Sequence, residues 1–289
     1  MLEAVRLFFS GQGYLEVETP CRVPAPIPEA TIRPYASESW FLQTSPEVCM
    51  KRLLGRGFPK IYQICRAFRR DERGRRHLPE FTILEWYRRD ADYNDLMEET
   101  ESLVRFVAAA LGRGDGLRYQ GRHIDLSAGW PRTSVSEAFG RYAGITDVEK
   151  MTQDRFDEGI VDVIEPALVG QRPVFLYDYP TATGASLARL KAADPRWAER
   201  FELYIGGLEL CNGFSELTGA ENYRRRFEQA RKKLKDTFGM DCPLPIGFLT
   251  DVADMPPAAG NALGVDRLAM LFCDTDDIAD VSAFPAEQL

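Results

Sequence analysis

Two short segments of the chain carry side chains that are suited to chemistry. Segment 207–217 is strand-like and holds two carboxylates, Glu209 and Glu216. Segment 260–268 is a glycine-bearing loop that opens a helix and delivers one arginine, Arg267. Carboxylates can hold Mg²⁺, and a planar guanidinium can bind phosphate oxygens. These segments therefore contain side chains that could bind a nucleoside triphosphate together with its metal.

A third segment concentrates positive charge in one turn between two apolar, strand-like stretches. Its six arginines are Arg66, Arg69, Arg70, Arg73, Arg75 and Arg76. This density favours an anionic ligand. The chain has no Walker P-loop, and segment 112–116 lacks the strand and helix of a dinucleotide-binding loop, so ATP must be held in another way. The three segments together predict an enzyme that activates a carboxylic acid with ATP.

The composition is that of an ordinary globular protein. The chain has 289 residues, of which 45% are hydrophobic and 28% are charged. No apolar run is long enough to span a membrane, and the early acid Glu3 does not fit a secretory signal. Six scattered cysteines without a CxxC pair indicate reduced, mostly buried thiols in a cytoplasmic protein. A net charge of −8 argues against bulk electrostatic capture of nucleic acid.

Apolar periodicity and capping residues define the expected elements. Asn94 is expected to cap a long helix, Ser134 and Glu137 form a capping box for a short helix, and Pro166 is expected to halt another. The expected helices are 2–9, 48–54, 94–111, 155–164, 222–238 and the segment after Gly264. The expected strands are 14–18, 60–64, 81–87, 174–178, 199–205 and 208–217.

The order of these elements predicts the fold class. Strands alternate with helices of varied length, which favours an antiparallel or mixed sheet flanked by helices over a doubly wound sheet. No repeat, low-complexity tract or linker divides the chain, so a single domain over residues 1–289 is expected. The proline-rich segment 23–28 is expected to form a loop over the active face.

Three segments resemble the signature motifs of one enzyme family. Residues 13–20 resemble motif 1 of the class II aminoacyl-tRNA synthetases, residues 68–82 resemble motif 2, and residues 260–267 resemble motif 3. The motifs stand in the family's order along nearly the whole chain. The resemblance implies an α+β fold with a class II synthetase-like antiparallel sheet flanked by helices. It also implies a homodimer built through motif 1, to which Leu7, Phe8 and Phe9 would contribute an apolar face.

Further segments are similar to the lysyl branch of this family: 44–47, 77–82, 209–217 and 264–267. Residues 185–188 and 262–267 are similar to its truncated, stand-alone members, which attach lysine to elongation factor P. Lysyl-tRNA synthetases carry an anticodon-binding OB-fold and normally have Gly where Ala262 stands, whereas this chain begins at the motif 1 helix. The resemblance therefore implies ATP-dependent activation of (R)-β-lysine as an adenylate. Transfer to a lysine of elongation factor P would follow.

The resemblance also assigns ATP-binding and metal-binding roles. Arg69 is implied to grip the α-phosphate and the amino-acid carboxylate, and Arg267 the γ-phosphate and the adenine face; both are the implied catalytic residues. Glu202 and Glu209 are implied to hold Mg²⁺. The implied ATP-binding set is Arg69, Arg70, Asp71, His77, Leu78, Phe81, Glu209, Leu210, Gly264 and Arg267. The motif 2 Asn-Glu of the family is Arg70-Asp71 here, followed by Glu72, so either Asp71 or Glu72 could reach adenine.

A second implied set recognises the amino acid. It contains Ser45, Pro46, Glu47, Glu85, Tyr87, Asn212, Glu216 and Ala262. Glu47, Glu216 and Tyr87 would surround the ε-ammonium, and Glu85 would lie near the α-amino group. A pocket with three carboxylates rejects acidic substrates and favours a diamino acid. The methyl group of Ala262 should penalise α-lysine more than β-lysine.

Four functions are compared. A ligase acting on elongation factor P is favoured. Charging of tRNA is disfavoured by the missing anticodon-binding module and the acidic net charge. Ammonia-dependent amide synthesis from an aspartyl adenylate is disfavoured by the acidic substrate pocket. A non-catalytic paralogue is disfavoured because Arg69, Arg267, Glu209 and Glu216 are all present. The residues leave open whether α- or β-lysine is the substrate and which macromolecule accepts it.

Overall fold

A large mixed sheet lies at the centre of the structure, a computed structural model that describes residues 1–185 and 187–285. Its eight strands are ordered β1-β5-β6-β13-β12-β11-β10-β9. Their bounds are β1 Leu15–Glu16, β5 Lys60–Phe68, β6 Glu80–Arg89, β9 Arg132–Ser134, β10 Val174–Pro180, β11 Trp197–Ile205, β12 Leu208–Ser215 and β13 Ala258–Gly264. Only β1 with β5 and β9 with β10 pair in parallel. The expected α+β class and the antiparallel or mixed sheet are therefore confirmed.

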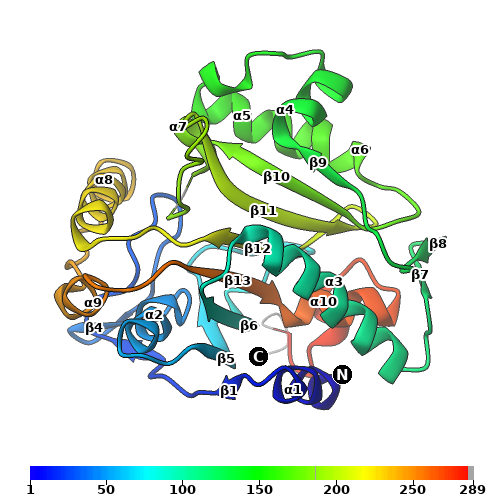
Figure 1. The fold of residues 1–289 in the computed structure, drawn as a ribbon, viewed down its shortest axis with the longest axis horizontal. Helices are drawn as coiled ribbons and strands as arrows, with labels where there is room; N and C mark the ends of the chain where they lie inside the picture. The colour runs from blue at the N-terminus through cyan, green and yellow to red at the C-terminus, as the bar shows by residue number, and fades with distance from the viewer. Residues whose placement is uncertain (186, 286–289) are drawn as a thin grey trace.

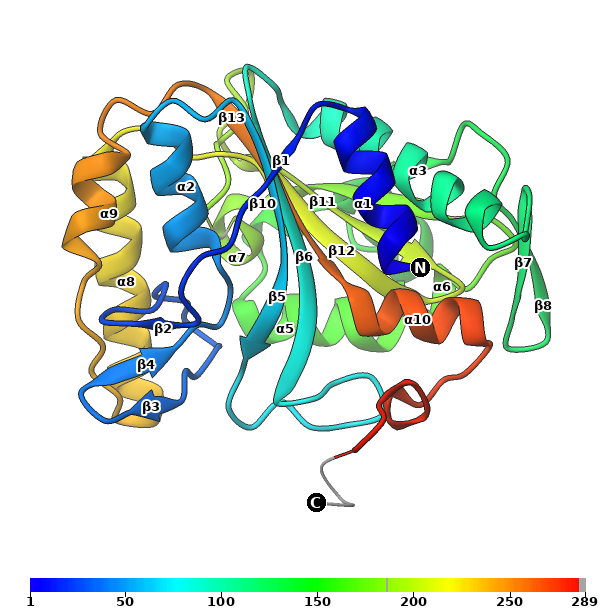
Figure 2. The same ribbon diagram turned by 90° about the horizontal axis from the view of Figure 1, so that it is seen from below.

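Helices cover both faces of this sheet (Figures 1 and 2). The helices α1, α3 and α10 pack on one side, and α2, α8 and α9 gather on the other (Figure 2). A third group of helices, α4 to α6, packs near β10 and β9 (Figure 1). The bounds are α1 Leu2–Gly11, α2 Glu47–Gly55, α3 Tyr93–Ala110, α4 Val135–Ala138, α5 Gln153–Gly159, α6 Glu165–Ala167, α7 Thr181–Gly184, α8 Ala220–Phe238, α9 Ile246–Asp251 and α10 Val265–Cys273.

The first helix is anchored through aromatic side chains. The ring of Phe9 stacks on Tyr62 of β5 with the ring centroids 4.6 Å apart. Beside them, the carboxylate of Glu99 on α3 accepts hydrogen bonds from Tyr14 Oη at 2.7 Å and from Trp86 Nε1 at 2.9 Å. Both polar ring groups are satisfied inside an apolar cluster, which fixes α1 and α3 against the sheet. Because Phe8 and Phe9 are buried in this core, they do not form the exposed apolar face that was expected of them.

Three local predictions are wrong, each for a definable reason. Asp92, and not Asn94, caps α3, because its side chain accepts from the backbone N–H groups of residues 94 and 95 in a capping box. Pro166 does not halt its helix, because it stands in the first turn of α6, where a backbone N–H is not needed. Segment 260–264 is a strand, β13, paired on both sides, and only its last residue opens α10.

Several elements carried no clear signal in the sequence. Three short strands, β2 (Arg22–Val23), β3 (Ala36–Ser37) and β4 (Trp40–Leu42), form a separate small sheet. The strands β7 (Gly116–Tyr119) and β8 (Arg122–Asp125) form a hairpin. The chain between β2 and β3 contains the proline-rich segment, which leads residues 28–32 to the wall of the main cavity. The expected loop over the active face is thus present.

No helix in residues 1–185 and 187–285 is long and apolar enough to cross a membrane. All six cysteines belong to the described residues and none forms a disulfide. Only Cys211 and Cys242 are buried, so the expectation of mostly buried thiols is wrong.

Candidate active site

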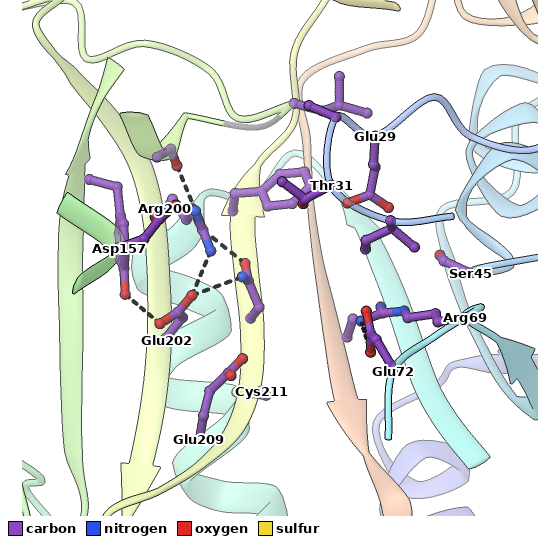
Figure 3. A pocket seen from close by; sticks show the side chains of 18 of the residues that line it. Glu29, Thr31, Ser45, Arg69, Glu72, Asp157, Arg200, Glu202, Glu209 and Cys211 are labelled. Atoms are coloured by element: carbon purple, nitrogen blue, oxygen red, sulfur yellow. Dashed lines mark hydrogen bonds and ion pairs between the residues drawn. The ribbon is translucent and has the colours of Figure 1, made fainter. Parts of the chain in front are cut away.

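A cavity of about 760 Å³ opens between the central sheet, the proline-rich loop and the first turns of α2 and α10. The residues expected in the site come from six separate segments of the chain, and the fold brings most of them to this one cavity. Those that line it are Ser45, Glu47, Arg69, His77, Leu78, Phe81, Glu85, Glu202, Glu209, Leu210, Asn212, Ala262, Gly264 and Arg267. Figure 3 shows Glu202 and Glu209 on one side of the pocket and Arg69 and Glu72 on the other.

Five expected site residues do not line the cavity: Pro46, Arg70, Asp71, Tyr87 and Glu216. Pro46 is the N-cap residue of α2. The backbone of Asp71 has a positive φ of 68°, and its exposed carboxylate forms an ion pair with Arg33. The next residue, Glu72, lines the cavity instead. Of the two acids at this turn, Glu72 is therefore the one placed to meet a ligand.

One end of the cavity is rich in arginine. Arg267 donates to the backbone oxygen of Glu209 at 2.8 Å and to its carboxylate at 3.2 Å. Its other terminal nitrogen lies 2.7 Å from His77 Nε2. Arg76 reaches the same corner and donates to the carbonyl of Gly207 at 3.1 Å. The motif 2 turn and the start of α10 thus meet in one polar cluster, which we call the arginine end.

The histidine of this cluster is held in its neutral form. Burial lowers the pKa of His77, and the positive charge of Arg267 lowers it further. A guanidinium has only donors, so Nε2 must accept the hydrogen bond and the ring proton must sit on Nδ1. His77 therefore orients Arg267 and is not set up as a general acid.

Arg69 stands between the two ends of the cavity. Its Nε donates to the carbonyl of Thr44 at 3.3 Å, and its guanidinium lies over the ring of Phe81 at 5.1 Å from the centroid. Its Nη1 is 3.7 Å from the carboxylate of Glu72. The terminal nitrogens of Arg69 remain close to the cavity, where a carboxylate or a phosphate could bind them.

The opposite end is acidic and contains a feature that the sequence did not reveal. The ammonium of Lys51, on α2, forms ion pairs with both Glu47 and Glu216. Lys51 is fully buried, and the rings of Tyr87 and Tyr223 lie within cation–π distance of it. Two carboxylates expected to bind the substrate ammonium are thus already bridged by an internal ammonium. We call this group the acid end.

The electrostatics of the acid end follow from burial. Burial would lower the pKa of Lys51, but Glu216 and Glu47 hold it well above its usual range, so the ammonium stays charged. Burial raises the pKa of Glu216, and Lys51 opposes this rise. One oxygen of Glu216, Oε1, is buried and has no hydrogen-bond partner among the described residues. It faces Gly260, where any side chain would clash with both Glu216 and Tyr87.

Glu85 belongs to the same end of the cavity. Its carboxylate accepts from Ser45 Oγ at 2.5 Å and from Tyr87 Oη at 2.9 Å. Burial, with the nearby charge of Glu47, raises the pKa of Glu85 to about 7. Both of its oxygens already have donors, so Glu85 is a buried, hydrogen-bonded acid that is partly protonated near neutral pH.

Glu202 also has partners on both oxygens. Oε1 accepts from Arg200 at 2.5 Å and from Asn212 at 3.1 Å. Oε2 accepts from Tyr179 at 2.5 Å and from Tyr204 at 2.8 Å. Burial raises the pKa of Glu202, and Arg200 opposes the rise. In this arrangement Glu202 holds Asn212 and Arg200 in place at the cavity wall. Figure 3 shows the ion pair of Glu202 with Arg200.

A residue fits Mg²⁺ only if it has a free oxygen to offer as a ligand. Glu209 lines the cavity and only one of its carboxylate oxygens is engaged, by Arg267, so it can offer a hard oxygen ligand. Glu202 offers no free oxygen in this arrangement. Among the described residues, no three acids, histidines or cysteines form a ready-made metal site. Glu209 with the phosphate oxygens of a nucleotide is therefore the better fit.

The sequence prediction gave no role to Glu29 and Arg200, which line the cavity, or to Lys51, which is buried and does not line it. Glu29 follows the proline-rich segment directly, which was the available signal. Lys51 stands four residues after Glu47 on α2, a helical spacing that permits an ion pair. Ser186, which is part of the similar segment 185–188, lies outside the described residues.

The fold and the site define a class of protein. The chain belongs to the family of tRNA synthetases class II (D, K and N), which it matches over residues 1–288.

Curated relatives narrow the comparison. The chain is 39% identical over 311 residues to a protein of Pectobacterium carotovorum subsp. carotovorum (strain PC1). It is 38% identical over 307 residues to a protein of Enterobacter sp. (strain 638). In both comparisons the match covers 100% of this chain and 93% of the relative. Both relatives are named elongation factor P--(R)-beta-lysine ligase.

Proposed function

We propose that this protein is an ATP-dependent ligase that activates (R)-β-lysine as an aminoacyl-adenylate. It then transfers the aminoacyl group to a lysine side chain of elongation factor P. The observation that carries the proposal is the polarity of one cavity, which has arginines at one end and buried carboxylates at the other, with Arg69 between them. The names of the full-length relatives support the same reaction and acceptor.

The proposed binding mode follows this polarity. Arg69 would bind the substrate carboxylate and the α-phosphate, where negative charge concentrates as the adenylate forms. Arg267, His77 and Arg76 would bind the outer phosphates, and adenine would take the face of Phe81 that Arg69 now covers. The chain of methylenes would run toward the acid end. There the carboxylates of Glu47 and Glu85, which line the cavity, are proposed to meet the ε-ammonium, with Tyr87 bonded to Glu85 and Glu216 held through Lys51.

Magnesium is proposed as the second cofactor besides ATP. When bound, Mg²⁺ would neutralise phosphate charge, and Glu209 is the residue proposed to hold it. Glu209→Gln should therefore lower the rate of adenylate formation at least ~10²-fold. Glu228→Gln, an exposed change on α8, serves as a matched control. Near-normal exchange activity of Glu209→Gln across a magnesium titration would remove Glu209 from the site.

The decisive experiment separates the acid that is activated from the acceptor that receives it. ATP–pyrophosphate exchange should be measured with (R)-β-lysine and with α-lysine, and a stronger signal is expected with (R)-β-lysine. Transfer of the labelled amino acid should then be followed to elongation factor P and, in parallel, to tRNA. Labelling of elongation factor P alone supports the proposal. Exchange followed by charging of tRNA would assign the chain to the tRNA-charging members of its family instead.

We also propose a homodimer and one catalytic domain over residues 1–289. The apolar side chains that α1 and β1 leave exposed are Leu2, Leu7 and Leu15, and not Phe8 or Phe9. Exposed apolar groups of this kind are suited to a two-fold interface. Sedimentation that shows a monomer at micromolar concentration would contradict the dimer.

A cytoplasmic location belongs to the same proposal, because translation factors act there.

A further inference from the structure

We propose that Glu29 binds the second amino group of the diamino-acid substrate, the one carried close to the carboxylate. This inference rests on the proposed function and adds a specificity-determining residue to it. Glu29 lies in the loop that follows the proline-rich segment, and its side chain lines the cavity. In Figure 3 its carboxylate points from this loop toward the side of the pocket where Arg69 and Glu72 lie.

The carboxylate of Glu29 is available to a ligand. None of the residues that the structure describes donates a hydrogen bond to it, and it forms no ion pair with them. Burial raises the pKa of Glu29 to about 7. The charges that act on this carboxylate come from several elements: Arg69 and Arg200 lower its pKa, and Glu47 and Glu72 raise it. Glu29 is half-buried, and a bound ammonium would supply the donors that its carboxylate lacks.

The other acids at this end already have partners. Ser45 and Tyr87 donate to Glu85, and Lys51 pairs with Glu47. Asn212, a further polar group of the wall, accepts from Arg200 and donates to Glu202. Glu29 thus differs from Glu47 and Glu85, because none of the described residues donates to either of its oxygens and a new donor would displace no protein group.

The chemistry of the substrate places its second amino group near this acid. If Arg69 holds the carboxylate, an amino group on the α- or β-carbon lies only two or three bonds away from the carboxylate carbon. That group must therefore stand beside Arg69, on the part of the wall that Glu29 faces. The ε-ammonium, farther along the chain, is left to the acid end. One cavity can then bind both ammonium groups of a diamino acid through different carboxylates.

The test compares ligands that differ only in this amino group. Glu29→Gln should raise the KM for (R)-β-lysine and for α-lysine about 10- to 100-fold, the loss typical of one hydrogen bond to a charged group. The KM for ATP should stay unchanged. The inhibition constant of 6-aminohexanoate, which lacks the second amino group, should also change little. Glu29→Asp, which keeps the carboxylate, should restore part of the affinity for the diamino acids.

The controls separate this inference from the proposed function. Glu38→Gln removes a carboxylate whose side chain is 82% exposed in the turn between β3 and β4, and should leave all constants unchanged. If Glu29→Gln weakens all three ligands alike, or weakens none, Glu29 has no role in reading the second amino group and the inference is wrong. If the wild-type enzyme activates neither lysine isomer, the proposed function fails, and this inference fails with it.

Discussion

The two ends of the cavity differ in how their charges are arranged before any ligand binds. At the acid end, the Lys51 ammonium is fully buried between Glu47 and Glu216, and tyrosine rings close it off from solvent. At the arginine end, the pair of Arg267 and Glu209 lies at the cavity wall and remains partly exposed. The first arrangement is part of the core, whereas the second is part of the binding surface.

This difference indicates two ways of preparing a site. A buried ion pair is costly to break, because each charge would be left without a partner in a medium of low polarity. The acid end is therefore expected to keep its geometry when substrate binds. A partly exposed pair is worth much less, so ligand phosphates can replace Glu209 as a partner of Arg267. We expect the acid end to govern the choice of substrate and the arginine end to govern the rate of activation.

The largest expected effect tests the residue between the two ends. Arg69→Ala should lower the rate of ATP–pyrophosphate exchange by about 10²- to 10³-fold, because it removes a positive charge from the place where the adenylate forms. Arg75→Ala is the matched control: its side chain belongs to the same turn but is 68% exposed and pairs with Asp276 outside the cavity. If both variants lost exchange activity equally, the turn would have only a structural role, and the Arg69 side chain would have no specific role in activation.

The second prediction breaks the acid end. Lys51→Met should lower the free energy of unfolding by about 3–5 kcal/mol, because it leaves buried carboxylates without their ammonium. It should also raise the KM for the diamino acid more than it lowers kcat. Lys232→Met, at an exposed pair with Asp236, is the control and should cost less than about 1 kcal/mol.

A double variant sharpens the same test. Lys51→Met combined with Glu216→Gln removes one of the two carboxylate charges left unpaired, so it should recover part of the lost stability in urea denaturation. If Lys51→Met unfolds at the same urea concentration as the wild type, the acid end is not a rigid, prearranged group, and the contrast with the arginine end disappears.

The sequence predicts the arginine end of the cavity better than the acid end. The hairpin of β5 and β6 and the start of α10 follow from apolar periodicity, turn residues and Gly264, so the arginine end could be predicted from local patterns. The bridge made by Lys51 joins α2 to Glu216, the residue that follows β12, through a long-range contact. No local pattern contains it, because a lysine on a helix near a glutamate is more often a surface pair. The small sheet of β2 to β4 was missed because its strands are only two or three residues long.

The third prediction concerns pH and the buried acid Glu85. Its pKa is raised to about 7 in the folded protein, so folding favours its protonated form. Its contribution to stability is therefore fully present below the unfolded pKa, near 4.3, and is lost as the pH rises through about 7. Between pH 5 and pH 8 the ligand-free enzyme should lose on the order of 1–3 kcal/mol through this group. Glu85→Gln should make the stability less dependent on pH, and the exposed Glu80→Gln should not.

The smallest expected effect concerns the shape of the wall between the two ends. Ala262 lines the cavity, and on β13 it stands opposite Asn212 on one side and Glu85 on the other. Its methyl group therefore lies where it could contact an amino group placed near the substrate carboxylate. One methyl group discriminates by only about 1–3 kcal/mol, and we expect the lower part of this range, about 10-fold. Ala262→Gly should raise exchange with α-lysine relative to β-lysine.

A control on the same strand decides how that result is interpreted. Ala259→Gly changes a core position of β13 that does not line the cavity, so it should lower stability without changing the ratio of the two isomers. Ala262→Gly could leave the ratio of exchange with α-lysine and β-lysine unchanged while Glu29→Gln alters the affinity for both isomers. In that case the second amino group is recognised through its charge and not through the shape of the cavity. If both variants move the ratio, the loop and the strand act together, and the preference for one isomer arises where the acid end meets Arg69.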